Sequence, residues 1–217
     1  MSRKIDPSLI PPRPDLTFEH SLWEQRLRHL AGIDEAGRGC LAGPVAAAAV
    51  ILPADPGVMD WLTGVRDSKQ LSPNQRERTA ERIKSVALTW QVAFSSAREI
   101  DRLGILPATR TAVHRALSGL DPQPEHLLVD YLTLPEISTP QTRLVKGDLR
   151  SLSIAAASIL AKTVRDQVMI DLDRRFPDYD WRNNKGYGTA AHRQAVQDHG
   201  PCSEHRMTFA PLRELNP

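Results

Sequence analysis

The chain has 217 residues, of which 25% are charged and 41% hydrophobic, and it carries a formal net charge of +2 with a pI near 8.7. This composition is typical of a soluble globular protein with one full core, or of one domain with a small appendage. No apolar run reaches the roughly 18 to 20 residues that a membrane span needs. The near-neutral charge is compatible with nucleic-acid binding through a local basic groove, but does not argue for it.

The two cysteines, Cys40 and Cys202, are too few for a disulfide framework, and neither has the C-x-x-C spacing of a zinc site. The N-terminal residues contain several prolines and lack the apolar core of a signal peptide. We therefore expect a cytoplasmic protein without a membrane segment, and with this charge a monomer.

The N-terminal third is predicted to contain an arm, a short helix and a hairpin. Residues 1–18 contain four prolines and are expected to form an extended arm outside the fold. Leu22, Trp23 and Leu27 have helical spacing and predict a short helix within residues 18–28. Two apolar runs then predict antiparallel strands over residues 30–35 and 45–52.

The following segments alternate between helices and strands. Ser72, Pro73 and Gln75 form the pattern of a capping box and predict the start of a helix over residues 73–85. The remaining elements are expected to be strands over 88–95, 126–130 and 142–146, the last continuing to Asp148, and helices over 100–120, 151–176 and 190–199. This order predicts an α/β mixed sheet flanked by helices in residues 19–176, followed by a small helical appendage in residues 177–217.

Four carboxylates stand at the predicted strand ends, and this is the most informative pattern in the chain. They are Asp34, Glu35, Asp130 and Asp148. Asp34 and Glu35 can serve one site only if the chain bends between or just after them, which Ala36 and the nearby glycines permit. Several carboxylates around one point can hold two Mg²⁺ or Mn²⁺ ions, which prefer oxygen ligands. The pattern therefore predicts a carboxylate site for two divalent metal ions.

Asp166 is a rival fourth acid. It lies inside the predicted long helix, four residues after Lys162. An ion pair between residues i and i+4 of one helix explains this spacing without a metal. We therefore leave Asp166 out of the predicted metal set.

The string D-E-A-G-R-G followed by L-A-G-P-V, and the string K-G-D ahead of S-L-S-I-A-A-A-S-I-L-A-K, resemble the motifs of ribonuclease HII. The resemblance covers about residues 30–211 and implies a ribonuclease H-like fold. It also implies a metal-dependent endonuclease of DNA repair. Such an enzyme cleaves the RNA strand of RNA–DNA hybrids and cuts 5′ to single ribonucleotides in duplex DNA. The products carry 3′-OH and 5′-phosphate ends. The four acids named above match the acids of the family.

The same resemblance suggests substrate contacts. Residues Gly37, Arg38 and Gly39 correspond to the element that touches the ribonucleotide 2′-OH, mainly through backbone groups, and the 2′-OH is what distinguishes RNA from DNA. Tyr187 corresponds to the tyrosine that stacks on the deoxyribose after the ribonucleotide. Phosphate contacts, which position a duplex without reading its sequence, are expected from Ser68, Lys69, Lys146, Lys162 and Lys185.

Three residues depart from the family pattern. Cys40 stands where a proline is common, Tyr131 where a glycine is usual, and Met207 where a second arginine is expected. None of the departures removes an acid. Two alternatives remain open: a type-1-like nuclease that needs a run of ribonucleotides, and a non-catalytic nucleic-acid-binding module of the same fold. Cleavage at a single ribonucleotide would exclude the first, and any metal-dependent cleavage would exclude the second.

Overall fold

A computed structural model describes residues 5–65, 68 and 71–215. They fold around one five-stranded sheet with strand order β3-β2-β1-β4-β5. β1 pairs antiparallel with β2 and β2 antiparallel with β3, whereas β4 and β5 run parallel to β1. The predicted mixed sheet and its first hairpin are confirmed. The strands are β1 (Leu30–Ala36), β2 (Val45–Ile51), β3 (Thr89–Ser95), β4 (His126–Asp130) and β5 (Gln141–Leu144).

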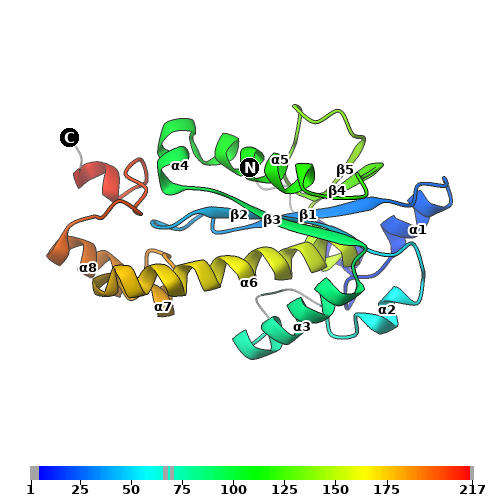
Figure 1. The fold of residues 1–217 in the computed structure, drawn as a ribbon, viewed down its shortest axis with the longest axis horizontal. Helices are drawn as coiled ribbons and strands as arrows, with labels where there is room; N and C mark the ends of the chain where they lie inside the picture. The colour runs from blue at the N-terminus through cyan, green and yellow to red at the C-terminus, as the bar shows by residue number, and fades with distance from the viewer. Residues whose placement is uncertain (1–4, 66–67, 69–70, 216–217) are drawn as a thin grey trace.

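Helices cover both faces of the sheet (Figure 1). One face packs against α5 (Ile105–Ser118), and the other packs against α6 (Leu152–Arg175), which is flanked by α3 (Pro73–Val86). Because side chains alternate along a strand, Ala31 and Ile33 of β1 join the core on the α5 side. Asp34, one residue further along, therefore points toward α6.

The structure differs from the prediction in the number and the bounds of several helices. The predicted helix over 100–120 is two helices, α4 (Ala97–Leu103) and α5, because Gly104 between them has a φ of 82°. The short N-terminal helix is α1 (Thr17–Trp23), and a further short helix, α2 (Val58–Trp61), follows Gly57. The capping box that joins Ser72 to Gln75 is confirmed.

The strand predicted over 142–146 ends earlier than expected. β5 stops at Leu144, and Lys146 adopts a left-handed backbone with a φ of 55°. This conformation turns the chain into the short 3-10 helix η3 (Gly147–Leu149). Asp148 therefore lies in that turn and not on the strand itself.

The end of the N-terminal arm belongs to the fold. After η1 (Pro7–Leu9), Asp15 forms a parallel bridge with Ser151, and its carbonyl accepts a hydrogen bond from the backbone of Leu152 at 2.8 Å. Leu16 is buried in the core beneath the sheet. The expectation that all of residues 1–18 lie outside the fold is therefore wrong for its last few residues.

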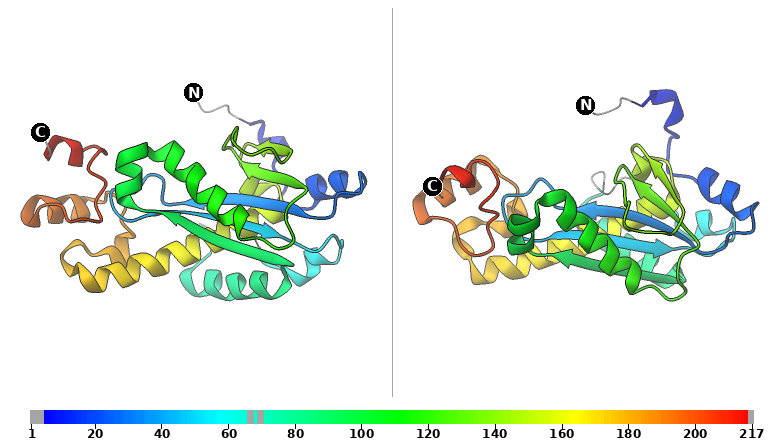
Figure 2. Two further views of the ribbon diagram at one scale, coloured as in Figure 1. Left: turned by 45° about the horizontal axis from the view of Figure 1, so that its top comes forward. Right: turned by 90° about the horizontal axis from the view of Figure 1, so that it is seen from above.

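The C-terminal segment gathers at the end of α6 that lies far from α1 (Figure 2). It begins with η4 (Pro177–Tyr179) and continues with α7 (Trp181–Asn184), α8 (Ala190–His199) and η5 (Leu212–Leu215). Its apolar side chains form a cluster with Leu41, Ala42 and Met169. The boundaries of α8 match the prediction. Within the described residues, no helix has the length and apolar character to cross a membrane.

The core of this segment contains two histidines that must both be neutral. His192 Nδ1 lies 2.9 Å from the carbonyl oxygen of Tyr187 and therefore carries a proton, so that its Nε2 accepts from Trp181 Nε1 at 3.0 Å. His205 Nδ1 accepts from the Cys202 backbone at 3.0 Å, which places its own proton on Nε2, 3.1 Å from His192 Nε2. Burial and the neighbouring His192 lower the pKa of His205 to about 4.

This pKa predicts a loss of stability in acid. Between pH 6.5 and about 4 an unfolded His205 binds a proton and the folded one does not, so stability falls as the pH is lowered. Acidification from pH 7 to 5 should lower the free energy of unfolding by about 2 kcal/mol through this group. Urea unfolding at several pH values measures the slope. His205→Asn should reduce it, and the same change at the exposed His114 should not; equal slopes would contradict the assignment.

Candidate active site

The four predicted acids lie at neighbouring places in the structure. Asp34 and Glu35 are in β1, Asp130 ends β4, and Asp148 lies in η3. Ile33 of β1 is in register with Val129 of the adjacent parallel strand β4, so Asp34 and Asp130 stand at the same level. Asp34 is 6% exposed and Asp148 9% exposed.

The pKa of Asp34 depends on burial and on the other three acids. Burial raises the pKa of Asp34 well above its usual range, and repulsion from Glu35, Asp130 and Asp148 raises it further. A hydrogen bond with the side chain of Ser158 opposes this shift. Like charges have such an effect only at short range, because water and ions screen distant pairs. A divalent cation is the kind of ligand that would relieve this repulsion.

The carboxylates also accept hydrogen bonds from the protein. Asp34 Oδ1 accepts from the backbone of Glu35 at 2.7 Å, and Asp130 Oδ1 from the backbone of Gly147 at 2.7 Å. Glu35 Oε1 accepts from Arg38 Nη1 at 2.8 Å. As placed, no three acid, histidine or cysteine side chains of the described residues have the spacing of a metal site. The oxygen donors fit Mg²⁺ or Mn²⁺ in kind, and the side chains would have to turn to surround an ion.

The chain bends just after Glu35, as predicted. Gly37 has a φ of 90°, which favours glycine, and its carbonyl accepts a hydrogen bond from the backbone of Cys40 at 3.3 Å. Proline at position 40 would lack this donor. Gly37 is buried, whereas Arg38 is partly exposed and Gly39 is exposed.

The segment with Tyr187 lies against this bend. The backbone of Leu41 donates to the carbonyl of Gly186 at 2.8 Å. Tyr187 follows directly and is 41% exposed, with Lys162 Nζ 5.5 Å from the centre of its ring. The structure therefore brings together two of the predicted substrate elements, residues 37–39 and Tyr187, from opposite ends of the chain.

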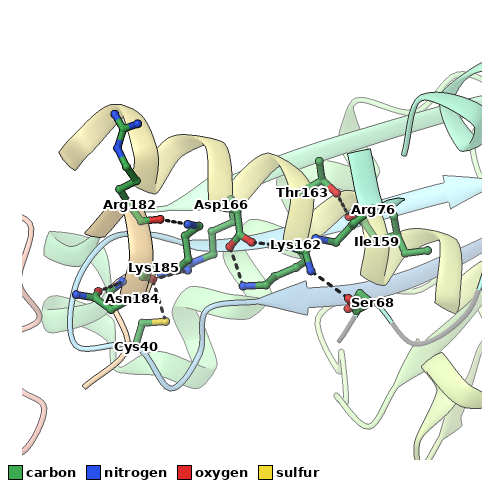
Figure 3. A network of polar contacts seen from close by, with 12 residues as sticks. Cys40, Ser68, Arg76, Ile159, Lys162, Thr163, Asp166, Arg182, Asn184 and Lys185 are labelled. Carbon is green, nitrogen blue, oxygen red and sulfur yellow. Dashed lines mark hydrogen bonds and ion pairs between the residues drawn. The ribbon is translucent and has the colours of Figure 1, made fainter. Parts of the chain in front are cut away.

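Asp166 is the centre of a polar network (Figure 3). Lys162 Nζ donates to one of its oxygens at 2.7 Å, which confirms the predicted ion pair, and Arg76 Nη2 donates to the other at 3.0 Å. Arg76 also donates to the carbonyl of Ser68 at 3.0 Å, and the hydroxyl of Ser68 lies 3.3 Å from that of Ser158. The network thus runs from Lys162 toward the residue that contacts Asp34.

The remaining predicted phosphate contacts lie in different surroundings. Lys185 donates from Nζ to the carbonyl of Arg182, and burial lowers the pKa of Lys185. Lys146 is exposed and precedes the turn with Asp148. Lys69 falls outside the described residues.

One of the departures from the family pattern, Tyr131, has a visible consequence. Tyr131 has a φ of 51°, a left-handed conformation that costs a side-chain-bearing residue roughly 1–2 kcal/mol. This conformation explains why a glycine suits the position after Asp130. Met207 donates its backbone N–H to Asp101 at 2.9 Å, a contact that does not depend on its side chain.

Comparison with solved structures defines the class of protein. The chain is similar to ribonuclease H2 from Pyrococcus horikoshii OT3, with a TM-score of 0.71, 24% identity, and coverage of 86% of this chain and 96% of that one. It is also similar to ribonuclease HII of Archaeoglobus fulgidus, solved in complex with PCNA, with a TM-score of 0.71, 30% identity, and coverage of 83% and 95%. The predicted ribonuclease H-like fold is confirmed.

The family follows from sequence. Residues 31–212 match the family described as Ribonuclease HII. A ribonuclease HII from Synechococcus sp. (strain JA-3-3Ab) is 55% identical over 94% of this chain and 91% of its own length, and one from Geobacillus kaustophilus is 48% identical over 92% and 75%. The chain therefore belongs to the ribonuclease HII family. It is an endoribonuclease that acts on RNA–DNA hybrids, and this identification sets aside the non-catalytic alternative.

Proposed function

We propose that this enzyme cuts duplex DNA on the 5′ side of a single embedded ribonucleotide, in addition to the RNA strand of hybrids, and serves ribonucleotide excision repair. The observation that supports this most is the contact between the loop after β1, with Gly37 to Gly39, and the segment with Tyr187. A site that must recognise one ribonucleotide followed by a deoxyribose needs both elements at fixed positions. We also propose a cytoplasmic monomer.

In this mechanism Asp34, Glu35, Asp130 and Asp148 hold two Mg²⁺ or Mn²⁺ ions. When bound, such ions supply an activated water and neutralise charge at the leaving 3′ oxygen, which leaves 3′-OH and 5′-phosphate ends. The backbone of residues 37–39 contacts the 2′-OH, and Tyr187 stacks on the next sugar. Phosphates of the backbone are contacted by Ser68, Lys69, Lys146, Lys162 and Lys185.

A panel of three substrates tests the proposal. We expect Mg²⁺- or Mn²⁺-dependent cleavage of a duplex with one ribonucleotide, with the cut 5′ to it, and of an RNA–DNA hybrid, but no cleavage of the all-DNA duplex. EDTA should abolish both reactions. Cleavage of the hybrid alone would contradict the proposal and favour a nuclease that needs a run of ribonucleotides. Cleavage in the presence of EDTA would contradict the proposed role of the metal ions.

A further inference from the structure

Arg165 of α6 is a fully buried arginine whose three guanidinium nitrogens all donate to backbone carbonyls. Nε donates to Pro44 at 2.9 Å, Nη2 to Ala42 at 3.2 Å and Nη1 to Lys185 at 2.9 Å. The first two carbonyls belong to the loop after β1 and the third stands two residues before Tyr187. One side chain therefore holds both substrate elements.

Arg165 also lies directly beneath the bend at Gly37. A Cβ atom added to Gly37 would stand 1.9 Å from Arg165 Nε and 2.6 Å from its Cδ and Cζ. The bend can thus approach the guanidinium only because residue 37 has no side chain. Arg165 consequently fixes how far the bend lies from α6 and how far it lies from residue 185.

A second buried arginine repeats the arrangement from the C-terminal segment. Arg206 donates from Nε to Gly43 at 3.0 Å and from Nη1 to Arg38 at 2.9 Å, and its guanidinium lies over the ring of Phe209. Burying a guanidinium is costly, and burial lowers the pKa of Arg206 to about 10. Two buried guanidinium groups lie under the same loop. This indicates that holding the loop in a fixed position outweighs the stability that is lost by burying them.

We infer that Arg165, supported by Arg206, is a positioning residue that sets the spacing between the 2′-OH-contacting loop and Tyr187, and thereby the preference for a single ribonucleotide. The inference rests on the proposed function. A lone ribonucleotide can be cut in only one register, with its 2′-OH at residues 37–39 and the next deoxyribose at Tyr187. A run of ribonucleotides offers several registers and depends less on this spacing.

The test compares wild type with Arg165→Lys, which keeps the charge but cannot donate to three carbonyls in a plane. A shift of about 1 Å in a positioned group can cost about 100-fold in rate. We therefore expect kcat/KM on the single-ribonucleotide duplex to fall at least about tenfold more than kcat/KM on a duplex with a run of ribonucleotides. Arg174→Lys, on the same helix with a side chain 67% exposed, should change neither value.

An equal loss on both substrates, or no loss on either, would overturn the inference while leaving the proposed function intact. Failure of wild type to cut the single-ribonucleotide duplex would instead overturn the proposed function. Thermal unfolding shows whether Arg165→Lys is folded. If it is not folded, Arg206→Lys provides the same comparison. Failure of both variants to fold would overturn the inference, because it would show that the two arginines are required for folding.

Discussion

Replacing Asp34 or Asp148 by asparagine is expected to lower the rate of RNA–DNA hybrid cleavage by about 1,000-fold or more, equal to about 4 kcal/mol of transition-state stabilisation. Asparagine keeps the shape of the side chain but removes the negative charge that holds a divalent ion. The buried carboxylate of Asp34 is repelled by three others, so Asp34→Asn should leave the free energy of unfolding equal or higher. Single-turnover cleavage in Mg²⁺ or Mn²⁺ and urea unfolding measure the two effects.

Two matched substitutions show whether the charge loss matters only at this site. Asp171→Asn makes the same change on the exposed side of α6, where the carboxylate pairs with Arg174, and should have no effect on rate. Asp166→Asn removes a carboxylate whose two oxygens are both engaged, by Lys162 and Arg76, and should cost less than tenfold. A loss at Asp166 as large as that at Asp148 would return Asp166 to the metal set.

Local sequence patterns were sufficient to predict much of the fold. The capping box at Ser72, the β1–β2 hairpin and the limits of α8 each depend on residues close together in the chain. The placement of Asp34 and Asp130 also followed from local patterns, because an acid at the end of an apolar strand reaches the sheet edge wherever the strand is paired.

The sequence could not show contacts between distant segments. Arg76 and Asp166 are 90 residues apart, and Arg165 reaches the carbonyl of Ala42 across 123 residues. A buried arginine that donates to backbone carbonyls has no acidic partner, so no pair of opposite charges in the sequence indicates its position. The left-handed backbone of Lys146, which ends β5 early, was also missed because lysine does not signal such a turn.

The close approach of α6 to β1 is another long-range feature, and it predicts a large effect. A Cβ atom added to Gly32 would lie 2.1 Å from the carbonyl carbon of Ser153 and 2.6 Å from the backbone nitrogen of Ile154. These are backbone atoms of the first turn of α6 and cannot rotate away. Gly32→Ala should therefore destabilise the protein by about 3 kcal/mol through overpacking. That loss would lower Tm by about 6–12 °C in a chain of this size.

Gly39→Ala is the matched control for this prediction, since a Cβ at residue 39 meets no atom within 4 Å. Its free energy of unfolding should change by less than about 0.5 kcal/mol. An unchanged Tm in Gly32→Ala would contradict the close packing of α6 on β1. Gly32 and Asp34 are two residues apart on one strand and face the same helix, so a displaced α6 also withdraws Ser158 from Asp34. Gly32→Ala should therefore lower kcat even at temperatures where the variant is fully folded, because the helix that stabilises the sheet also positions the acids.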